Sequence, residues 1–225
     1  MRSKIGAMQV VSVNVGLPRQ VETPHGIVIT SIFKSPVTER VAVRKHNLDG
    51  DRQADLRVHG GPNKAVYAYS LEHYSYWTKQ LPNTDLPFGK FGENLTITGL
   101  TEEQAHIGDQ YRIGTCILRV TQPRMPCFKL AIRFERADML KLFWRSGLSG
   151  IYFAIVQEGE LGVEDDIELV EEHPARVAVT DVVKVYKRET TDLDMYAHVM
   201  QAPIAGSWKE EIRERWAQMM LADAE

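Results

Sequence analysis

The sequence predicts a mainly β protein with some α structure: a strand-rich, barrel-like body followed by a small subdomain of three helices. Two observations support this class. Over the first two-thirds of the 225-residue chain, short segments rich in Val and Ile recur at close intervals, separated by Pro, Gly or Asn. After His173-Pro174 the apolar residues instead recur at helical spacing. We therefore divide the chain into residues 1–173 and 174–225.

The predicted elements of the body follow from local composition. Ser70 is a suitable N-cap for a helix over 71–80, and Gly147 can end a second helix over 137–146. Neither a repeating βαβ layout nor an internal repeat is present. The strands are expected at 8–15, 26–32, 40–46, 64–69, 94–98, 111–121 and 151–157.

The tail from residue 177 onward contains three short apolar periods. Asp192 and Ser207 are candidate N-caps, and Pro203 must interrupt or begin a helix because it lacks the backbone donor. These helices could pack on the barrel, cover it as a lid, or form a contact between two copies of the chain.

Composition excludes several function classes. The net charge of −3 gives no reason to expect nucleic-acid binding, and no apolar run is long enough to span a membrane. The N-terminus lacks the pattern of a secretory signal, so we expect a cytoplasmic protein with reduced cysteines. Two cysteines cannot supply a four-cysteine metal site, and no HExxH, GxGxxG or phosphate-binding loop motif is present.

Cys127 lies in the most distinctive segment, QPRMPCFK at residues 122–129. Pro123 and Pro126 restrict the backbone and keep the segment out of a sheet interior. The nearby cations Arg124 and Lys129 favour a thiolate, the form that binds metals or attacks electrophiles. The alternative is a buried, inert cysteine. Cys116 lies in the middle of a strand and is expected to be an ordinary core residue.

Three further segments contain candidate binding residues. In residues 50–70, the turn His59-Gly60-Gly61 can bring backbone N–H groups close to an anion, with Arg52 and Lys64 adding charge. Asn94 follows a glycine turn, and Lys34 follows a strand. Each also has an ordinary structural reading: a hairpin turn, a local cap or a surface lysine.

Taken together and in this order, the segments resemble the MOSC family, named after the C-terminal domain of molybdenum-cofactor sulfurase. The resemblance runs through IFKSPV, GDRQADLRVHGGPNKAVYAYSLEHYSYW, FGENLT, IGDQYRIG, QPRMPCFKL and SGLSGIYFAIVQEGE, and so covers roughly residues 8–170. The tail resembles the three-helix domain found in a subgroup of stand-alone bacterial members. The resemblance implies a strand-rich MOSC-type β-barrel that binds a molybdopterin form of the molybdenum cofactor.

Cys127 occupies the cysteine position that ligates molybdenum in the reductase branch of the family, and a soft thiolate suits that role. The residues that would hold the anionic and polar parts of the cofactor are Lys34, Arg52, His59, Gly60, Gly61, Lys64, Asn94 and Arg124. The implied activity is reduction of N-hydroxylated compounds, such as 6-hydroxylaminopurine, to amines. Electrons would come from a separate flavoprotein reductase, because no electron-donor site is recognisable in the chain.

Two other functions compete with this one. In the first, Cys127 carries a persulfide and the protein transfers sulfur or handles the cofactor. In the second, the C-terminal helices bind nucleic acid or protein without catalysis. Their basic residues are followed at once by acidic ones, which favours packing against the barrel or a homodimer contact.

Overall fold

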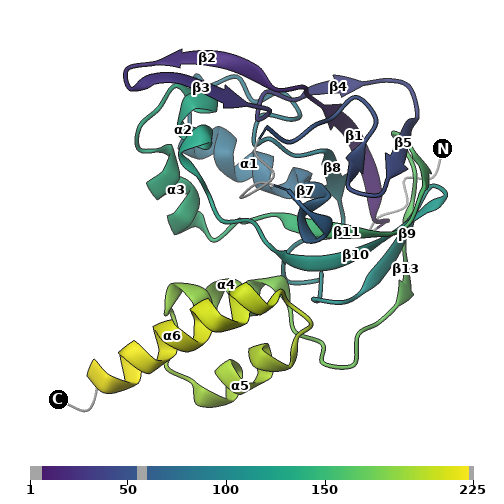
Figure 1. The fold of residues 1–225 in the computed structure, drawn as a ribbon. Helices are drawn as coiled ribbons and strands as arrows, with labels where there is room; N and C mark the ends of the chain where they lie inside the picture. Colours follow the sequence, from purple (N-terminus) through teal and green to yellow (C-terminus); the bar gives the residue numbers. More distant parts are fainter. Residues whose placement is uncertain (1–6, 55–59, 223–225) are drawn as a thin grey trace.

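The computed structural model describes residues 7–54 and 60–222, with a strand-rich body followed by three C-terminal helices (Figure 1). The strands are β1 (Gln9–Val15), β2 (Arg19–Thr23), β3 (Gly26–Thr30), β4 (Ser35–Val37), β5 (Val41–Arg44), β6 (Asn47–Leu48), β7 (Val66–Ser70), β8 (Leu95–Thr98), β9 (Gln110–Ile113), β10 (Cys116–Pro123), β11 (Ile151–Gln157), β12 (Gly159–Leu161) and β13 (Ile167–Glu171). The helices are α1 (Leu71–Gln80), α2 (Phe128–Phe134), α3 (Met139–Ser146), α4 (Val179–Lys187), α5 (Leu193–Gln201) and α6 (Gly206–Ala222), with a 3₁₀ turn η1 (Pro62–Lys64).

The main sheet has eight strands in the order β13-β9-β10-β11-β7-β8-β1-β4. All neighbours are antiparallel except β7 and β8, which α1 connects as a crossover. Two smaller sheets, β12-β5-β6 and β2-β3, flank it. The strand-rich class with C-terminal helices is therefore confirmed.

The main sheet is strongly curved, but its described strands do not close into a barrel. Its edge strands, β13 and β4, do not pair with each other. β1 meets the segment before β13 through one bridge, Gln9 to Asp166, and through backbone bonds such as that from Val10 N to Asp165 O at 3.0 Å. The closure does not continue along β1, because its residues Val13–Val15 pair with β4 instead.

Most predicted elements are present, with several differences. The predicted strand 111–121 is the hairpin β9–β10, because Gly114 turns the chain at φ +59°. The prediction did not include helix α2 or the short strands β2, β4, β6, β12 and β13. Ser70 precedes α1 as expected, but its hydroxyl donates to Leu100 O at 2.6 Å and caps no helix N–H. Ser207 lies inside α6, which begins at Gly206.

The C-terminal helices match their predicted positions. Asp192 caps α5 by accepting from the N–H groups of Asp194 and Met195, and Pro203 lies between α5 and α6. Trp208 and Ile212 of α6 belong to the same apolar core as the strands of the main sheet. The division at residue 173 stays a prediction. No helix in the described part of the chain is long and apolar enough to cross a lipid bilayer.

Candidate functional site

Cys127 lies where the chain leaves the main sheet. Strand β10 ends at Pro123, three residues form a loop, and Cys127 stands immediately before α2 with an extended backbone. Its thiol is free and half-buried at the wall of a pocket. Cys116 is completely buried, and its Sγ donates to Ile113 O at 3.0 Å. Burial raises the pKa of the Cys116 thiol to about 12. The predicted difference between the two cysteines is therefore confirmed as a difference in access.

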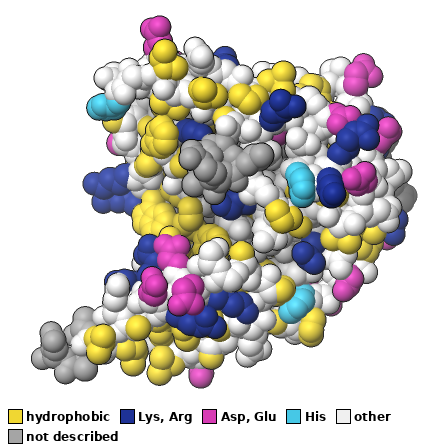
Figure 2. All heavy atoms as spheres, in the orientation of Figure 1, with side chains coloured by type: hydrophobic (Ala, Val, Ile, Leu, Met, Phe, Trp, Pro, Cys, Tyr) yellow, Lys and Arg dark blue, Asp and Glu magenta, His cyan; other side chains and the backbone are white. Residues whose placement is uncertain are grey.

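The pocket at Cys127 gathers residues from six separate segments and measures about 650 Å³ including its open mouth. Four of the predicted cofactor-binding residues line it together with Cys127. These are Lys34, Lys64, Asn94 and Arg124; the remaining walls come from Thr30, Ser31, Ile32, Gln53, Ala54, Tyr67, Gly92, Met125, Lys129 and Tyr152. On the face shown in Figure 2, basic and hydrophobic side chains meet between the strand-rich body and the helices below it.

Lys34 reaches the pocket as half of a buried ion pair. Its ammonium donates to the carboxylate of Asp51, which also accepts from Gly16 N and from Asn94 Nδ2, both at 2.9 Å. Burial lowers the pKa of Lys34, and the Asp51 carboxylate opposes that shift. Because Asp51 compensates the charge, Lys34 adds less positive field to the pocket than its sequence position suggests.

Asn94 is largely committed to holding the protein together. Its Oδ1 accepts from Tyr67 N at 3.1 Å, and its Nδ2 donates to Asp51 and to Asn14 O. From its position before β8, it therefore connects β7, β1 and the Lys34 ion pair. A direct contact from Asn94 to a cofactor stays a prediction.

Arg124 is 6% exposed and points into the pocket from the loop after β10. Its Nη1 donates to Phe91 O at 2.7 Å and to Tyr67 Oη at 3.4 Å, and its guanidinium lies over the Tyr67 ring at 4.8 Å. Nε and Nη2 make no hydrogen bond with any described residue, so they are available to an oxyanion.

A buried carboxylate positions the acceptor of Arg124. Glu93 accepts from Gly89 N at 2.8 Å and from Phe91 N at 3.0 Å, and so shapes the loop that presents the Phe91 carbonyl. Burial raises the pKa of Glu93. Tyr74 Oη and Thr96 Oγ1 also donate to Glu93, so the carboxylate connects this loop to α1 and β8.

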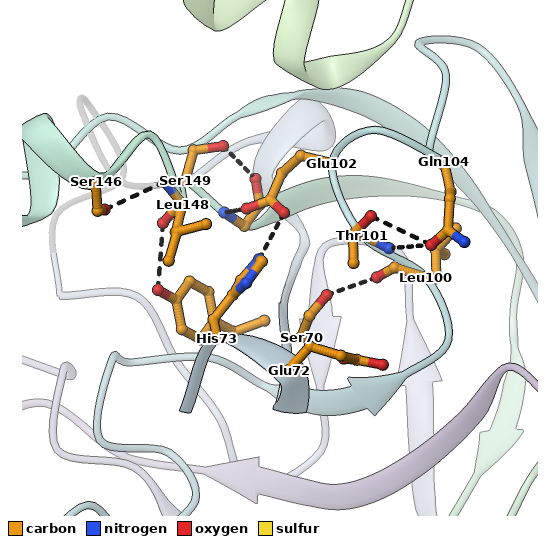
Figure 3. Close-up of polar contacts among 12 residues, drawn as sticks. Ser70, Glu72, His73, Leu100, Thr101, Glu102, Gln104, Ser146, Leu148 and Ser149 are labelled. Carbon is orange, nitrogen blue, oxygen red and sulfur yellow. Dashed lines mark hydrogen bonds and ion pairs between the residues drawn. The ribbon is translucent and has the colours of Figure 1, made fainter. Parts of the chain in front are cut away.

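Behind Tyr67, a second polar network fixes the loop between α3 and β11 (Figure 3). Glu102 binds His73 Nε2 at 2.6 Å and accepts from Gly150 N at 2.5 Å. Leu148 O accepts from Tyr69 Oη at 3.2 Å, and Ser149 O accepts from Tyr67 Oη at 2.9 Å. The loop thereby holds the ring on which Arg124 rests.

The remaining predicted residues do not all meet at Cys127. Lys64 lines the pocket from η1, and burial lowers its pKa. Gly61 begins η1 at φ +88°, but it faces a separate basic groove together with Arg52, which lies outside the Cys127 pocket. Gly60 precedes that turn and does not line the Cys127 pocket either. His59 lies outside the described residues.

Ser31 is a site residue that sequence reasoning missed. Its Oγ is buried at the pocket wall and has no hydrogen-bond partner among the described residues. Such a hydroxyl is free to hydrogen-bond with a polar group bound at that wall. Nothing in the sequence marks Ser31, because the pocket forms only when β3 and the β10–α2 loop come together.

The pocket presents one thiol and several cations, and the described residues contain no group of three or more His, Cys, Asp or Glu that could hold a metal ion. An anionic group bearing its own metal fits this donor set: the thiolate can complete the metal sphere, and Arg124, Lys64, Lys129 and the Ser31 hydroxyl can meet oxyanions.

Known proteins with related sequences and structures show the family to which the chain belongs. The MOSC domain family model matches residues 55–168, just over half of the chain. The chain is 34% identical over 207 residues to the uncharacterized protein YflK of Bacillus subtilis, covering 92% of this chain and 93% of YflK. It is 32% identical over 193 residues to a protein of Gibberella moniliformis named "Reductase", covering 84% of this chain but 34% of that protein.

The fold is also similar to a solved one. The crystal structure of YiiM from Geobacillus stearothermophilus superposes with a TM-score of 0.77 at 34% identity, covering 93% of this chain and 99% of that one. The match extends well beyond the residues of the family model, so it includes part of the C-terminal helices.

Proposed function

Because the chain belongs to the MOSC domain family, we propose that it is a molybdenum-cofactor-dependent reductase that converts N-hydroxylated compounds, such as 6-hydroxylaminopurine, to amines. One observation carries the proposal: the free thiol of Cys127 lies in an open pocket with Arg124, Lys64 and Lys129. A relative named as a reductase supports the general reaction class. The specific substrate rests on the family resemblance.

Different residues of the pocket would bind different parts of the cofactor. Cys127 would ligate molybdenum through Sγ, while Arg124 Nε and Nη2, Lys64 and the Ser31 hydroxyl would bind oxyanion and pterin groups. When bound, the cofactor supplies the two-electron redox chemistry, and the protein supplies orientation and electrostatics. The net reaction consumes two electrons and two protons, converts N–OH to N–H, and releases water.

We propose that a separate flavoprotein reductase supplies the electrons. The relative named "Reductase" supports this division, because about two-thirds of its length lies outside the match to this chain. A homodimer through the C-terminal helices remains a second, independent proposal.

The test is molybdenum content per chain and hydroxylaminopurine reduction, in protein made by a host that supplies the cofactor. We expect near-stoichiometric metal in the wild type, and loss of both metal and activity in Cys127→Ala. Cys116→Ser is the matched control and should retain both, because Cys116 is buried away from the pocket.

Two outcomes would contradict the proposal. Activity that survives in metal-loaded Cys127→Ala would remove the ligand role of Cys127. Protein without molybdenum but with a cyanide-releasable sulfur on Cys127 would instead favour sulfur transfer.

A further inference from the structure

Four cations form a strip on the strand-rich body that begins at the Cys127 pocket. This cationic strip consists of Arg19 at the start of β2, Lys90 in the loop between α1 and β8, and Lys129 and Arg133 of α2. Lys129 lines the Cys127 pocket, and Arg133 follows one helical turn later on the same side of α2. The strip therefore leads from the pocket along α2 toward β2.

The ring of Phe33 brings the strip together. The guanidinium carbon of Arg19 lies 3.5 Å from the centre of this ring, and that of Arg133 lies 5.0 Å from it. Lys90 Nζ lies 5.0 Å from the centre of the Phe134 ring, at the end of α2. Three elements that are distant in sequence therefore meet here, and Figure 1 shows α2 next to the β2–β3 hairpin.

No carboxylate neutralises the strip. Within residues 7–54 and 60–222, none of its four side chains forms an ion pair or a hydrogen bond, and Arg133 Nε is buried without a partner. By contrast, Arg40, Arg44 and Arg136 each pair with an aspartate. The net charge of the chain is −3, so the unpaired strip does not follow from a general excess of cations.

The charges of the strip repel one another. Burial lowers the pKa of Arg133, and the charge of Arg19 lowers it further. Burial also lowers the pKa of Lys90, and the charge of Arg133 adds to that shift. Asp85 opposes both shifts but forms no ion pair with any residue that the structure describes. An anionic partner would relieve this repulsion, because it would supply the opposite charge that the strip lacks.

The form of the strip favours an acidic protein surface over a small anion. Its cations come from three separate elements, and Arg19 is exposed. Phe128 directly follows Cys127 and is 54% exposed, so an aromatic contact is available next to the strip. Exposed aromatic residues and complementary charges are typical of protein–protein interfaces, and electron-transfer pairs use small, weakly binding ones.

We propose that the cationic strip docks an acidic face of the flavoprotein that supplies electrons to this chain. The inference rests on the proposed function and adds to it the docking surface and the charge of the partner. Docking there places the partner's reduced flavin next to the Cys127 pocket. The flavin is oxidised by two electrons, which the conversion of N–OH to N–H consumes with two protons as water is released.

The first experiment measures reduction of 6-hydroxylaminopurine by cofactor-loaded protein with two electron donors. One is reduced flavodoxin, a small acidic FMN protein, and the other is reduced methyl viologen, a small cation that needs no docking surface. We expect Arg19→Glu and Lys90→Glu each to lower kcat/KM for flavodoxin by about tenfold or more, because charge reversal removes the attraction between the two surfaces. With methyl viologen, both variants should match the wild type in rate and in molybdenum content.

The controls test whether charge at this place is what matters. Lys184→Glu makes the same change at an exposed position of α4, so it should match the wild type with both donors. Arg19→Lys keeps the charge and should keep most of the rate with flavodoxin. Added salt should slow the wild type with flavodoxin and leave its rate with methyl viologen unchanged, because salt screens exposed charges.

The second experiment measures binding of oxidised flavodoxin to the full-length protein by calorimetry, so it needs no reductase activity. We expect weaker binding by Arg19→Glu and Lys90→Glu, and unchanged binding by Lys184→Glu. Circular dichroism checks that each variant is folded.

Three results would overturn the inference. The first is wild-type protein that reduces the substrate with methyl viologen but neither binds flavodoxin nor accepts its electrons, which would leave the proposed function standing. The second is an equal loss with both donors in the variants, since the strip would then act on the site itself. The third is unchanged flavodoxin binding in variants that no longer respond to inorganic phosphate, which would assign the strip to a small anion.

One further result separates the docking surface from the proposed function. Flavodoxin binding that depends on Arg19 and Lys90, in a protein without activity even with methyl viologen, would support the surface and remove the proposed function.

Discussion

Cys127 and Cys116 show how much a single residue's surroundings change its chemistry. Both are free thiols separated by eleven positions, but Cys116 is packed inside the sheet while Cys127 borders two open pockets. The proline-flanked loop allowed the sequence to distinguish them, because such a segment cannot remain in a sheet interior. What the loop faces depends on distant segments.

At the residue scale we expect one fast-reacting thiol per chain with Ellman's reagent at pH 8. The pKa of Cys116 is raised to about 12, so its thiolate forms only as the pH approaches that value, and its burial blocks the reagent. The second thiol should react only after denaturation. Cys127→Ala should abolish the fast phase, and two fast thiols in the native wild type would contradict this assignment.

The buried pair Lys34–Asp51 gives a second prediction at this scale. Asp51→Asn should lower the free energy of unfolding by about 3–5 kcal/mol, because it leaves the Lys34 ammonium buried without its counter-charge. Denaturant titration of the cofactor-free protein measures the effect. Asp49→Asn is the control: its pair with Arg44 is exposed, so stability should hardly change. Equal losses of stability in both variants would show that burial does not determine how much an ion pair contributes to the free energy of unfolding.

At the scale of elements, the loop from Gly147 to Gly150 connects α3 to β11 and supports the site from behind. Gly147 and Gly150 both have φ +71°, but their surroundings differ. A Cβ on Gly147 would meet nothing within 4 Å, whereas one on Gly150 would lie 2.5 Å from Tyr67 Cε2. Tyr67 in turn supports Arg124.

The two glycines therefore form a matched pair of variants. Gly147→Ala should cost about 1–2 kcal/mol for the left-handed backbone alone. Gly150→Ala should cost about 2–4 kcal/mol, because the new methyl group also displaces Tyr67, and it should reduce molybdenum retention as well. Unfolding curves and metal analysis check both effects. Normal metal content in folded Gly150→Ala would show that this loop does not contribute to molybdenum retention.

Element prediction succeeded where the local signal was strong and failed where a turn depended on context. The end of α3 at Gly147 was predicted because a glycine there adopts the left-handed conformation that closes a helix. The β9–β10 hairpin was missed because Gly114 interrupts a run that alternates like one long strand. The cap at Ser70 was only half correct, since its hydroxyl bonds to Leu100 instead.

At the scale of the whole molecule, the body and the C-terminal helices share one apolar core. Backbone bonds from Ile107 N to Val177 O at 2.8 Å and from Val179 N to Ala105 O at 3.0 Å attach the start of α4 to the body. A second pocket, next to the one at Cys127, also needs both parts, because it is lined by Gln122 of β10 and Glu211 of α6.

We therefore expect the full chain to unfold in a single cooperative transition, followed by circular dichroism and Trp fluorescence. A chain ending at residue 173 should lose that cooperativity and bind a hydrophobic dye, because removing the helices exposes the core that Val179, Val182 and Trp208 cover. A truncated chain that unfolds cooperatively at the midpoint of the full chain would show that the body folds alone.

The sequence by itself determined the family, the strand-rich body with its helical tail, and Cys127 as the more accessible of the two thiols. These follow from local composition, periodicity and ordered motifs, which need no knowledge of distant contacts. Only the tertiary structure decided that Asp51 compensates Lys34, that Arg52 lies outside the Cys127 pocket, and that Gln122 meets α6 across a second pocket. Such relations join residues tens of positions apart, and their energies depend on burial and distance, which exist only once the chain has folded.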